Sequence, residues 1–296
     1  MPERPLPAEA WEDRLPELLE LLRDRRAVAL VGAGCSTESG IPDYRGPDGR
    51  MRHRRPMQFR EFVESADGRA RYWSRSAVGW PVFASARPNA AHVALADLER
   101  AGVLAGVITQ NVDGLHQAAG SREVVELHGS LARVRCLDCG RSERRDALQE
   151  RLLELNAGWL ARLGAASGEA GARPDGDAEL PAEALAGFRV PACEACDGVL
   201  KPDVVFFGES VPKERVGAAA SLLERADVLL VVGSSLAVYS GRRFVYRARD
   251  AGLPVGIVNQ GPTRADELAR VKVEGRAGDV LPRLARELGA VEARTL

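Results

Sequence analysis

The chain has 296 residues, a formal net charge of −1 and 28% charged residues. This length can bury a full hydrophobic core, either as one large domain or as a domain with a small module. The charge balance gives no support for nucleic-acid binding, and no apolar run approaches the roughly 20 residues that span a bilayer.

The amino terminus does not resemble a targeting segment. Residues 1–10 lack an apolar signal core, and Glu9, Glu12 and Asp13 are unlike the acid-poor presequences of mitochondrial proteins. We therefore expect a soluble cytoplasmic protein.

The first predicted elements lead into a nucleotide-binding turn. Leucines within 15–22 are spaced for an amphipathic helix, which precedes the apolar strand 27–31 and the turn Gly32–Thr37. A strand that runs into a Gly-x-Gly turn brings backbone N–H groups close to a pyrophosphate. A dehydrogenase would carry an acidic residue about 20 residues further on, whereas residues 50–55 are basic and contain no acid. The turn indicates nucleotide binding but argues against a dehydrogenase.

The rest of the chain alternates between apolar strands and helices. The strands lie near residues 28, 104, 124, 229 and 256, and one of the helices between them has Asn89 as its predicted N-cap. This alternation predicts an α/β fold, a doubly wound parallel (Rossmann-like) sheet covered on both faces. Two segments interrupt the pattern: 48–85 predicts a basic, aromatic helical lobe, and 133–200 predicts an inserted module.

Two Cys-x-x-Cys pairs, Cys136/Cys139 and Cys193/Cys196, lie in the inserted segment. In a cytosolic chain such pairs are more often a metal site than disulfides. Four thiolates from two short knuckles fit one tetrahedral structural Zn²⁺, with no position left open for substrate. The alternative is two separate redox-active thiol pairs. We expect Cys35 to fill space in the phosphate turn, because the sequence places no base beside it.

Polar motifs follow the predicted strands in a fixed order. Thr109–His116, Glu126–Gly129, Gly233–Ser235 and Asn259 each follow a strand, and Lys201–Glu209 comes after the cysteines. Active sites of doubly wound folds lie at such strand ends. The ordered set resembles the sirtuins, the NAD-dependent protein-lysine deacylases, over roughly residues 15 to 288.

The resemblance extends to a subclass and to a domain organisation. Residues 71–73, 78–81 and 261–264 are most similar to the class II branch, the type of mitochondrial sirtuin four, and the composition suggests a bacterial member. The resemblance implies a single catalytic domain, 1–296. Within it, the expected parts are a Rossmann-like large domain (15–47, 86–132 and 201–288), a helical cofactor- and acyl-binding lobe (48–85) and a zinc module (133–200).

The resemblance also implies the chemistry. The acyl-lysine carbonyl oxygen attacks C1′ of the nicotinamide ribose of NAD⁺, nicotinamide leaves, and His128 then accepts a proton from a ribose hydroxyl that attacks the imidate. The products are free lysine and O-acyl-ADP-ribose. Asn111 is expected to order the ribose and a water, and Asp113 to receive the carboxamide, with Ile41 against the ring. Histidine suits a base near neutral pH, although His128 and the Asn-x-Asp-Gly turn are also typical of purely structural positions.

The same resemblance assigns further contacts. The remaining NAD⁺ contacts are expected at Gly32, Ala33, Gly34, Ser36, Thr37, Asp43, Tyr44, Arg45, Gln110, Gly233, Ser234, Ser235, Asn259, Gln260, Gly261 and Ala277. The substrate backbone is expected to pair with a strand formed by Val204, Val205, Phe206, Phe207 and Gly208. Added-strand binding relies on main-chain hydrogen bonds, but an apolar run of this kind is equally typical of a buried core strand.

One further pair of residues is expected to bind the acyl group of the substrate. Tyr72 and Arg75 are three residues apart and share a helix face, and they resemble the pair with which desuccinylases hold an acidic acyl tail, where arginine binds the carboxylate. Trp73 and Trp80 could equally line an apolar channel, and Tyr72 and Arg75 could simply pack and solvate the helix. We predict weak deacetylation and better turnover of a bulkier or carboxylated acyl-lysine.

Other functions are consistent with parts of the sequence. A protein ADP-ribosyltransferase would use the same NAD⁺ site, whereas a non-catalytic NAD-sensing scaffold would not need His128, Asn111 and Asp113 together. A zinc-ribbon nucleic-acid binder is disfavoured, because the basic run 50–55 lacks interleaved aromatics. We expect acyl-lysine proteins or peptides as partners, no nucleic acid, no membrane, and a monomer.

Overall fold

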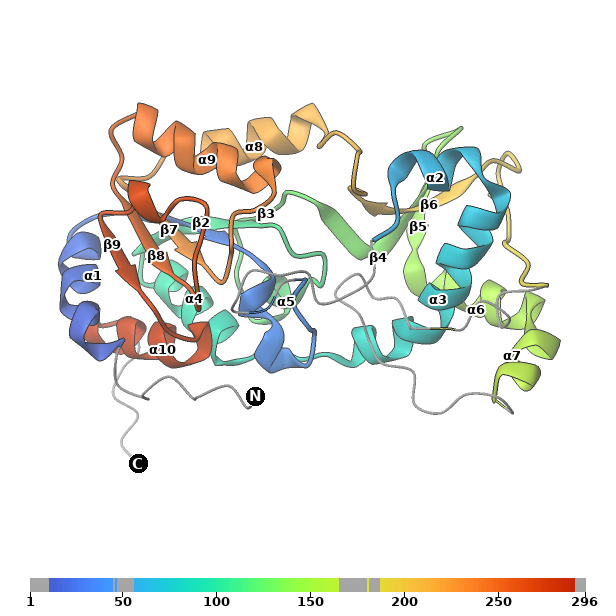
Figure 1. Ribbon diagram of the computed structural model, residues 1–296, viewed down its shortest axis with the longest axis horizontal. Helices are drawn as coiled ribbons and strands as arrows, with labels where there is room; N and C mark the ends of the chain where they lie inside the picture. Colours follow the sequence, from blue (N-terminus) through green and yellow to red (C-terminus); the bar gives the residue numbers. More distant parts are fainter. Residues whose placement is uncertain (1–10, 45, 47–55, 165–179, 181–186, 291–296) are drawn as a thin grey trace.

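The computed structural model describes residues 11–44, 46, 56–164, 180 and 187–290. Two bodies lie side by side along the long axis of the molecule (Figure 1), a larger one built on a six-stranded sheet and a smaller one built on a three-stranded sheet. No helix in these residues is long and apolar enough to cross a membrane.

The large sheet is parallel throughout and confirms the predicted doubly wound fold. Its strands, in spatial order, are β3 (Val124–Glu126), β2 (Leu104–Thr109), β1 (Ala27–Val31), β7 (Val228–Val232), β8 (Val255–Val258) and β9 (Val271–Val273). Every residue of β1 and β7 is buried, as expected of central strands covered on both faces. The chain order reverses between these two strands, and such a switch point leaves a crevice at the carboxyl ends of the strands.

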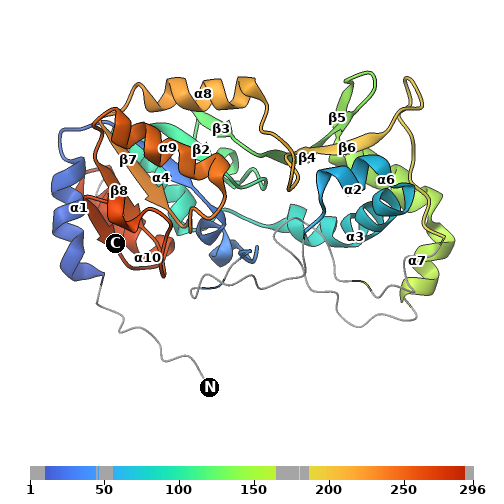
Figure 2. The same cartoon turned by 45° about the horizontal axis from the view of Figure 1, so that its top comes forward.

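Helices cover both faces of this sheet. On one face lie α1 (Leu15–Leu22), α4 (Ala90–Arg100) and α10 (Ala277–Glu287); on the other, visible together in Figure 2, lie α8 (Lys213–Leu223) and α9 (Tyr239–Asp250). The predicted N-cap is confirmed, because the Asn89 side chain accepts hydrogen bonds from the first turn of α4. The short elements are η1 (Glu12–Arg14), η2 (Ala33–Cys35), η3 (Thr37–Ser39), α5 (Leu115–Ala118) and η5 (Asp266–Leu268).

The small body combines the two interrupting segments into one unit. Its antiparallel sheet has the order β5 (Ser142–Arg144), β4 (Gly129–Cys136) and β6 (Leu200–Val204), and its helices are α2 (Phe59–Glu64), α3 (Ala66–Ser85), α6 (Arg145–Leu155) and α7 (Ala157–Gly164). The buried Arg145 guanidinium lies 5.4 Å from the Trp73 ring and 5.1 Å from the Trp80 ring, which joins α6 to α3. The helical lobe and the cysteine module therefore share one core.

An ion-pair network joins the two bodies. Asp203 of β6 accepts from Arg133 of β4 at 3.1 Å and from Arg215 of α8 at 2.6 Å, and Arg133 also contacts Glu126 of β3 at 2.6 Å. These side chains are half-buried. The network fixes the edge of the large sheet against the small one, directly beside the crevice.

Candidate active site

A cavity of about 520 Å³ lies at the carboxyl ends of the central strands and is lined by residues of both bodies. The turns after β1, β2 and β7 supply one wall, and the segment after β6 supplies the other. The switch point of the sheet therefore coincides with the cavity, as the fold predicts.

The Gly-x-Gly turn is packed against the turn after β7. A Cβ on Gly32 would lie 2.7 Å from the Ser234 Cβ, and a Cβ on Gly34 would lie 2.9 Å from the Gly233 oxygen. The Gly34 N–H donates to that oxygen at 2.9 Å. The sequence attributed these glycines to the approach of a pyrophosphate; the structure shows that the contact between the two turns also requires them.

Ser36, Asn111 and Asp113 form a buried hydrogen-bonded cluster beneath the cavity. Asn111 Nδ2 donates to Ser36 Oγ at 3.0 Å, and Ser36 Oγ donates to Asp113 Oδ2 at 2.7 Å. The Leu115 N–H donates to the other Asp113 oxygen at 2.9 Å. Burial raises the pKa of Asp113, although these two hydrogen bonds oppose the shift. Ser36 is one of the expected NAD⁺ contacts, and in this structure its hydroxyl hydrogen-bonds both Asn111 and Asp113.

His128 is held in one tautomer. Its Nδ1 lies 2.9 Å from the Gln110 carbonyl oxygen, which can only accept, so Nδ1 carries the proton. Nε2 is then unprotonated and accepts from Ser240 Oγ at 2.7 Å. Burial, with the charge of Arg215, lowers the pKa of His128, so its imidazole is neutral at pH 7. Ser240, on the first turn of α9, was not predicted, because no local pattern marks a residue brought in by the fold.

Most of the predicted NAD⁺ contacts line the cavity. They are Gly32, Ala33, Gly34, Ser36, Thr37, Ile41, Asp43, Tyr44, Gln110, Asn111, Asp113, Gly233, Ser234, Ser235, Asn259, Gln260 and Ala277. Gly261 is not part of the described lining; its carbonyl accepts from Asn259 Nδ2 at 3.1 Å and from Lys272 Nζ at 3.0 Å. Arg45 lies outside the described residues.

The predicted substrate segment lines the cavity, and its first residue is the last residue of a strand. Strand β6 ends at Val204, and the chain then turns at Gly208. The Phe206 N–H donates to the Glu209 carboxylate at 2.8 Å, and Glu209 is paired with the buried Lys201 at 3.0 Å. The Phe206 N–H therefore donates to the Glu209 side chain and not to a neighbouring strand.

Val204 and Phe206 are buried in the small-body core, whereas Phe207 is 36% exposed at the cavity. The Tyr44 ring packs edge-on against Phe207 at 6.0 Å. Both sequence interpretations therefore hold in part, since the same segment contributes to the core and to the cavity wall.

Only one residue of the predicted acyl-binding pair lines the described cavity. Tyr72 lines the cavity and packs edge-on against Phe206 at 5.2 Å, whereas Arg75 is half-buried and not part of the described lining. Trp73 and Trp80 do not form a channel: their ring nitrogens donate to the Leu200 oxygen and to Asp146, within the small body.

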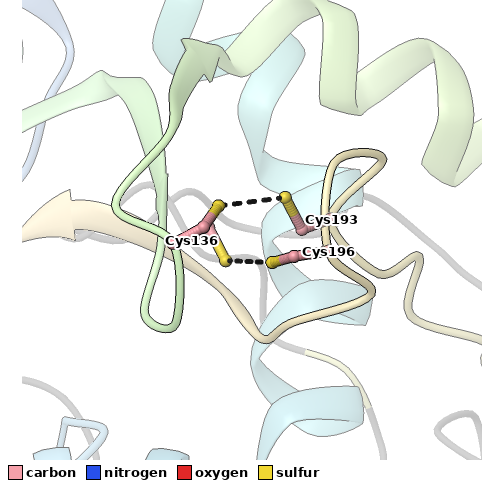
Figure 3. Close-up of side chains that lie close together, drawn as sticks. Cys136, Cys193 and Cys196 are labelled. Atoms are coloured by element: carbon pink, nitrogen blue, oxygen red, sulfur yellow. Dashed lines mark hydrogen bonds between the residues drawn. The ribbon is translucent and has the colours of Figure 1, made fainter.

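The four cysteines converge from the end of β4 with the turn after it and from the segment before β6. Figure 3 labels three of them, Cys136, Cys193 and Cys196. The sulfurs of Cys136 and Cys196 are 3.6 Å apart, those of Cys139 and Cys193 are 3.8 Å apart, and all four lie within 4.8 Å of one another. A tetrahedral zinc with sulfurs at about 2.3 Å has sulfur pairs about 3.8 Å apart. The cluster fits one structural Zn²⁺.

The fifth cysteine, Cys35, is not part of the zinc-binding cluster. It is fully buried in the core beneath the phosphate turn, and burial raises the pKa of its thiol. The residue is a neutral, space-filling side chain, as expected from the sequence.

Comparison with known proteins assigns a family to this geometry. The Sir2 family model matches residues 32–240. NAD-dependent protein deacetylase 1 of Mycobacterium avium is 54% identical over 273 residues, which cover 92% of this chain and 95% of the relative. The mitochondrial NAD-dependent protein lipoamidase sirtuin-4 of Bos taurus is 50% identical over 261 residues, 87% of this chain and 81% of the relative.

Solved structures agree with this assignment. A chain from the work "Structural Basis for the Mechanism and Regulation of Sir2 Enzymes" superposes with a TM-score of 0.73 at 35% identity, covering 95% of this chain and 100% of that one. The structure "Sir2 bound to acetylated peptide" gives 0.72 at 30% identity, covering 94% and 99%.

Proposed function

The chain belongs to the Sir2 family and is an NAD-dependent protein deacylase, and we propose that His128, Asn111 and Asp113 form its catalytic centre. The observation that carries this proposal is the fixed tautomer of His128, whose unprotonated Nε2 faces the cavity. A neutral imidazole with an unprotonated Nε2 can act as a general base at pH 7.

NAD⁺ is the co-substrate of this enzyme class, and the four cysteines are placed to bind one structural Zn²⁺. For NAD⁺ we propose that the pyrophosphate binds along the turn Gly32–Thr37, which follows β1 at the carboxyl edge of the sheet and lines the cavity. The adenosine would lie toward Ser234 and Asn259, at the ends of β7 and β8. The nicotinamide would lie toward Ile41 and Asp113, where the Asp113 carboxylate can accept a hydrogen bond from the carboxamide N–H.

The role proposed for His128 begins after nicotinamide has left. Nε2 takes the proton of a ribose hydroxyl, and the hydroxyl oxygen attacks the imidate carbon formed from the acyl-lysine. Ser240 now occupies the Nε2 lone pair at 2.7 Å, so the ribose hydroxyl must displace the Ser240 hydroxyl before proton transfer. Burial and, to a smaller extent, the charge of Arg215 lower the pKa of His128 and so favour the neutral imidazole.

His128→Ala tests this assignment. The variant should lose deacylation by a factor on the order of 10² to 10⁴, the usual contribution of a general base, while NAD⁺ binding measured by calorimetry is kept. The Gly32–Thr37 turn does not depend on His128 for its conformation, so binding and turnover are separable. A variant that deacylates at the wild-type rate would show that His128 is not the base.

The protein ADP-ribosyltransferase alternative has no specific support in the described residues. Following a label on the adenosine of NAD⁺ separates the two reactions. We expect the label in O-acyl-ADP-ribose; label retained on protein would favour the transferase.

For the acyl group we propose that a bulkier or carboxylated acyl-lysine is preferred to acetyl-lysine. The cavity wall near Tyr72 includes the apolar side chains of Met57, Phe83 and Leu131, and a relative that is 50% identical is named a lipoamidase. Kinetics on acetyl, succinyl, glutaryl and long-chain peptides, repeated with Arg75→Ala, decide this point. The highest kcat/KM for acetyl-lysine, with no change of preference in Arg75→Ala, would overturn it.

We further propose that the substrates are acyl-lysine proteins, in keeping with the acetylated-peptide complex of a Sir2 relative. The monomeric state, the absence of nucleic acid among the partners, the cytoplasmic location and the division into domains remain predictions.

A further inference from the structure

The first turn of α9 forms part of the cavity rim, close to the proposed base. Ser240 of this turn contacts His128, and Tyr239 and Arg243 line the cavity as well. Tyr239 and Arg243 are four residues apart and share one helix face, with the guanidinium carbon 5.2 Å from the Tyr239 ring centroid. We call Tyr239 and Arg243 the α9 rim.

The charge of Arg243 is not paired with any carboxylate of the described residues. The other arginine of the cavity lining, Arg276, is paired with Asp279 at 2.8 Å and with Glu38 at 3.6 Å. No described carboxylate lies within ion-pair distance of Arg243, and its buried Nε–H has no hydrogen-bond acceptor among the described residues. A buried donor without a partner destabilises the site, and an incoming acceptor would satisfy it.

The surroundings of Arg243 raise the local positive charge. Helix α9 carries four arginines and one aspartate, and among the described residues only Arg249 has an ion-pair partner, Asp250 at 2.7 Å. Arg242 also has a buried Nε–H without a described acceptor. The start of α9 is therefore complementary to an anionic group.

Exposure separates the rim from the proposed nucleotide site. Tyr239 is 57% exposed and the neighbouring Val238 is 42% exposed, whereas Ser234 and Asn259 of the proposed nucleotide site are buried. Phe207, 36% exposed, lines the same cavity from the segment after β6. Solvent-facing apolar and aromatic side chains at the mouth of a site are typical of contacts with a macromolecular substrate.

We propose that the α9 rim is a specificity subsite for acidic residues flanking the acyl-lysine of the protein substrate. A glutamate or aspartate side chain would accept from the Arg243 guanidinium, and the substrate backbone would pass between Tyr239 and Phe207. This subsite rests on the proposed function, because it serves the same acyl-lysine. It sets which proteins are used and takes no part in the chemistry.

Matched acyl-lysine peptides test the subsite. One glutamate, glutamine or lysine is placed at successive positions on either side of the acyl-lysine, and kcat and KM are measured at saturating NAD⁺. At the responsive position the glutamate peptide should have a KM about fivefold below that of the lysine peptide, the size of one exposed ion pair. The ratio should shrink in high salt, because exposed charge pairs are screened.

Charge reversal supplies the decisive comparison. Arg243→Glu should invert the preference, so that the lysine peptide has the lower KM, and Arg243→Gln should abolish it. Arg249→Glu is the matched control: Arg249 is on the same helix, is 53% exposed and is already paired, and it lies about 9 Å further along the axis. This control should keep the wild-type preference. Zinc content and thermal unfolding of each variant establish that it is folded.

The possible results are distinguishable. An unchanged preference in Arg243→Glu overturns the subsite, and so does an increase in KM for NAD⁺ without a change for peptide, which would assign Arg243 to a phosphate. Equal KM for all peptides with intact NAD-dependent deacylation overturns the subsite alone. Absence of deacylation with every acyl-lysine peptide would instead count against the proposed function.

Discussion

Lowering the pH from 7 to 5 should destabilise the large body through two buried histidines. His92 and His116 are almost completely inaccessible, and their rings are 4.8 Å apart. Burial lowers the pKa of His92 to about 4 and that of His116 to about 3, from 6.5. At a pH between the folded pKa of each histidine and 6.5, the unfolded chain binds a proton that the folded chain does not. Stability is therefore full above pH 6.5 and falls as the pH drops below it.

The size of the effect follows from the same shifts. At pH 5 the unfolded form of each histidine is almost fully protonated and the folded form almost fully neutral. Since one pH unit corresponds to 1.36 kcal/mol, each histidine removes about 2 kcal/mol of unfolding free energy at pH 5 relative to neutral pH. Neither ring nitrogen of His116 has a hydrogen-bond partner among the described residues, so replacing this residue breaks no described bond.

His116→Leu isolates one of the two contributions. Urea unfolding followed by far-UV circular dichroism is run at pH 7 and pH 5 for the wild type and the variant. The variant should lose about 2 kcal/mol less than the wild type on acidification. Acid effects on the zinc cluster are common to both proteins and cancel in the difference. The exposed neighbour Gln117→Ala should retain the full wild-type pH dependence.

An equal loss of stability in wild type and His116→Leu would refute this reasoning. It would mean that His116 is not a buried neutral imidazole in the folded protein.

Three other outcomes are expected. Changing any cysteine of the cluster to serine, for example Cys136→Ser, should lower both zinc content and melting temperature, because metal binding there is folding free energy; well-folded wild-type protein without zinc would contradict this. Arg215→Gln should move the acidic limb of the kcat/KM profile to higher pH, because the Arg215 charge lowers the pKa of His128, and a limb that stays in place or moves lower would argue against that coupling. Added nicotinamide should inhibit noncompetitively toward NAD⁺ by re-entering the pocket near Asp113, whereas insensitivity at millimolar concentration would speak against early nicotinamide release.

Features with strong local signals were predictable from the sequence. The central strands are continuous apolar runs, and the Cys-x-x-Cys spacing fixes a ligand set before any fold is known. The strand β9, Val271–Val273, was missed, because Lys272 between the two valines interrupts the continuous apolar run by which the central strands were recognised. The segment Val204–Gly208 was expected, from the resemblance, to form a strand that pairs with the substrate; in the structure β6 ends at Val204, and the Phe206 N–H donates to the Glu209 carboxylate, an interaction that no sequence pattern indicates.

Contacts made only by the tertiary fold were not predictable. Ser240 reaches His128 from 112 residues away, and nothing in its neighbours marks it. Arg243 reads as an ordinary surface arginine in the sequence, and its unpaired position at a cavity rim is visible only in three dimensions. Likewise, Tyr72 and Arg75 share a spacing, yet only Tyr72 lines the described cavity.

The pairing of β1 with β7 has a consequence for biosynthesis. Ala27 pairs with Val228, so one side of β1 stays open until residues near 232 have left the ribosome. By then the chain already holds all of the small body, whose last strand ends at Val204. At about 5 to 20 residues per second, the nascent chain spends many seconds with a fully apolar strand edge exposed. We expect chaperone dependence during translation to arise from this half of the molecule, and the cysteine-containing half to mature first.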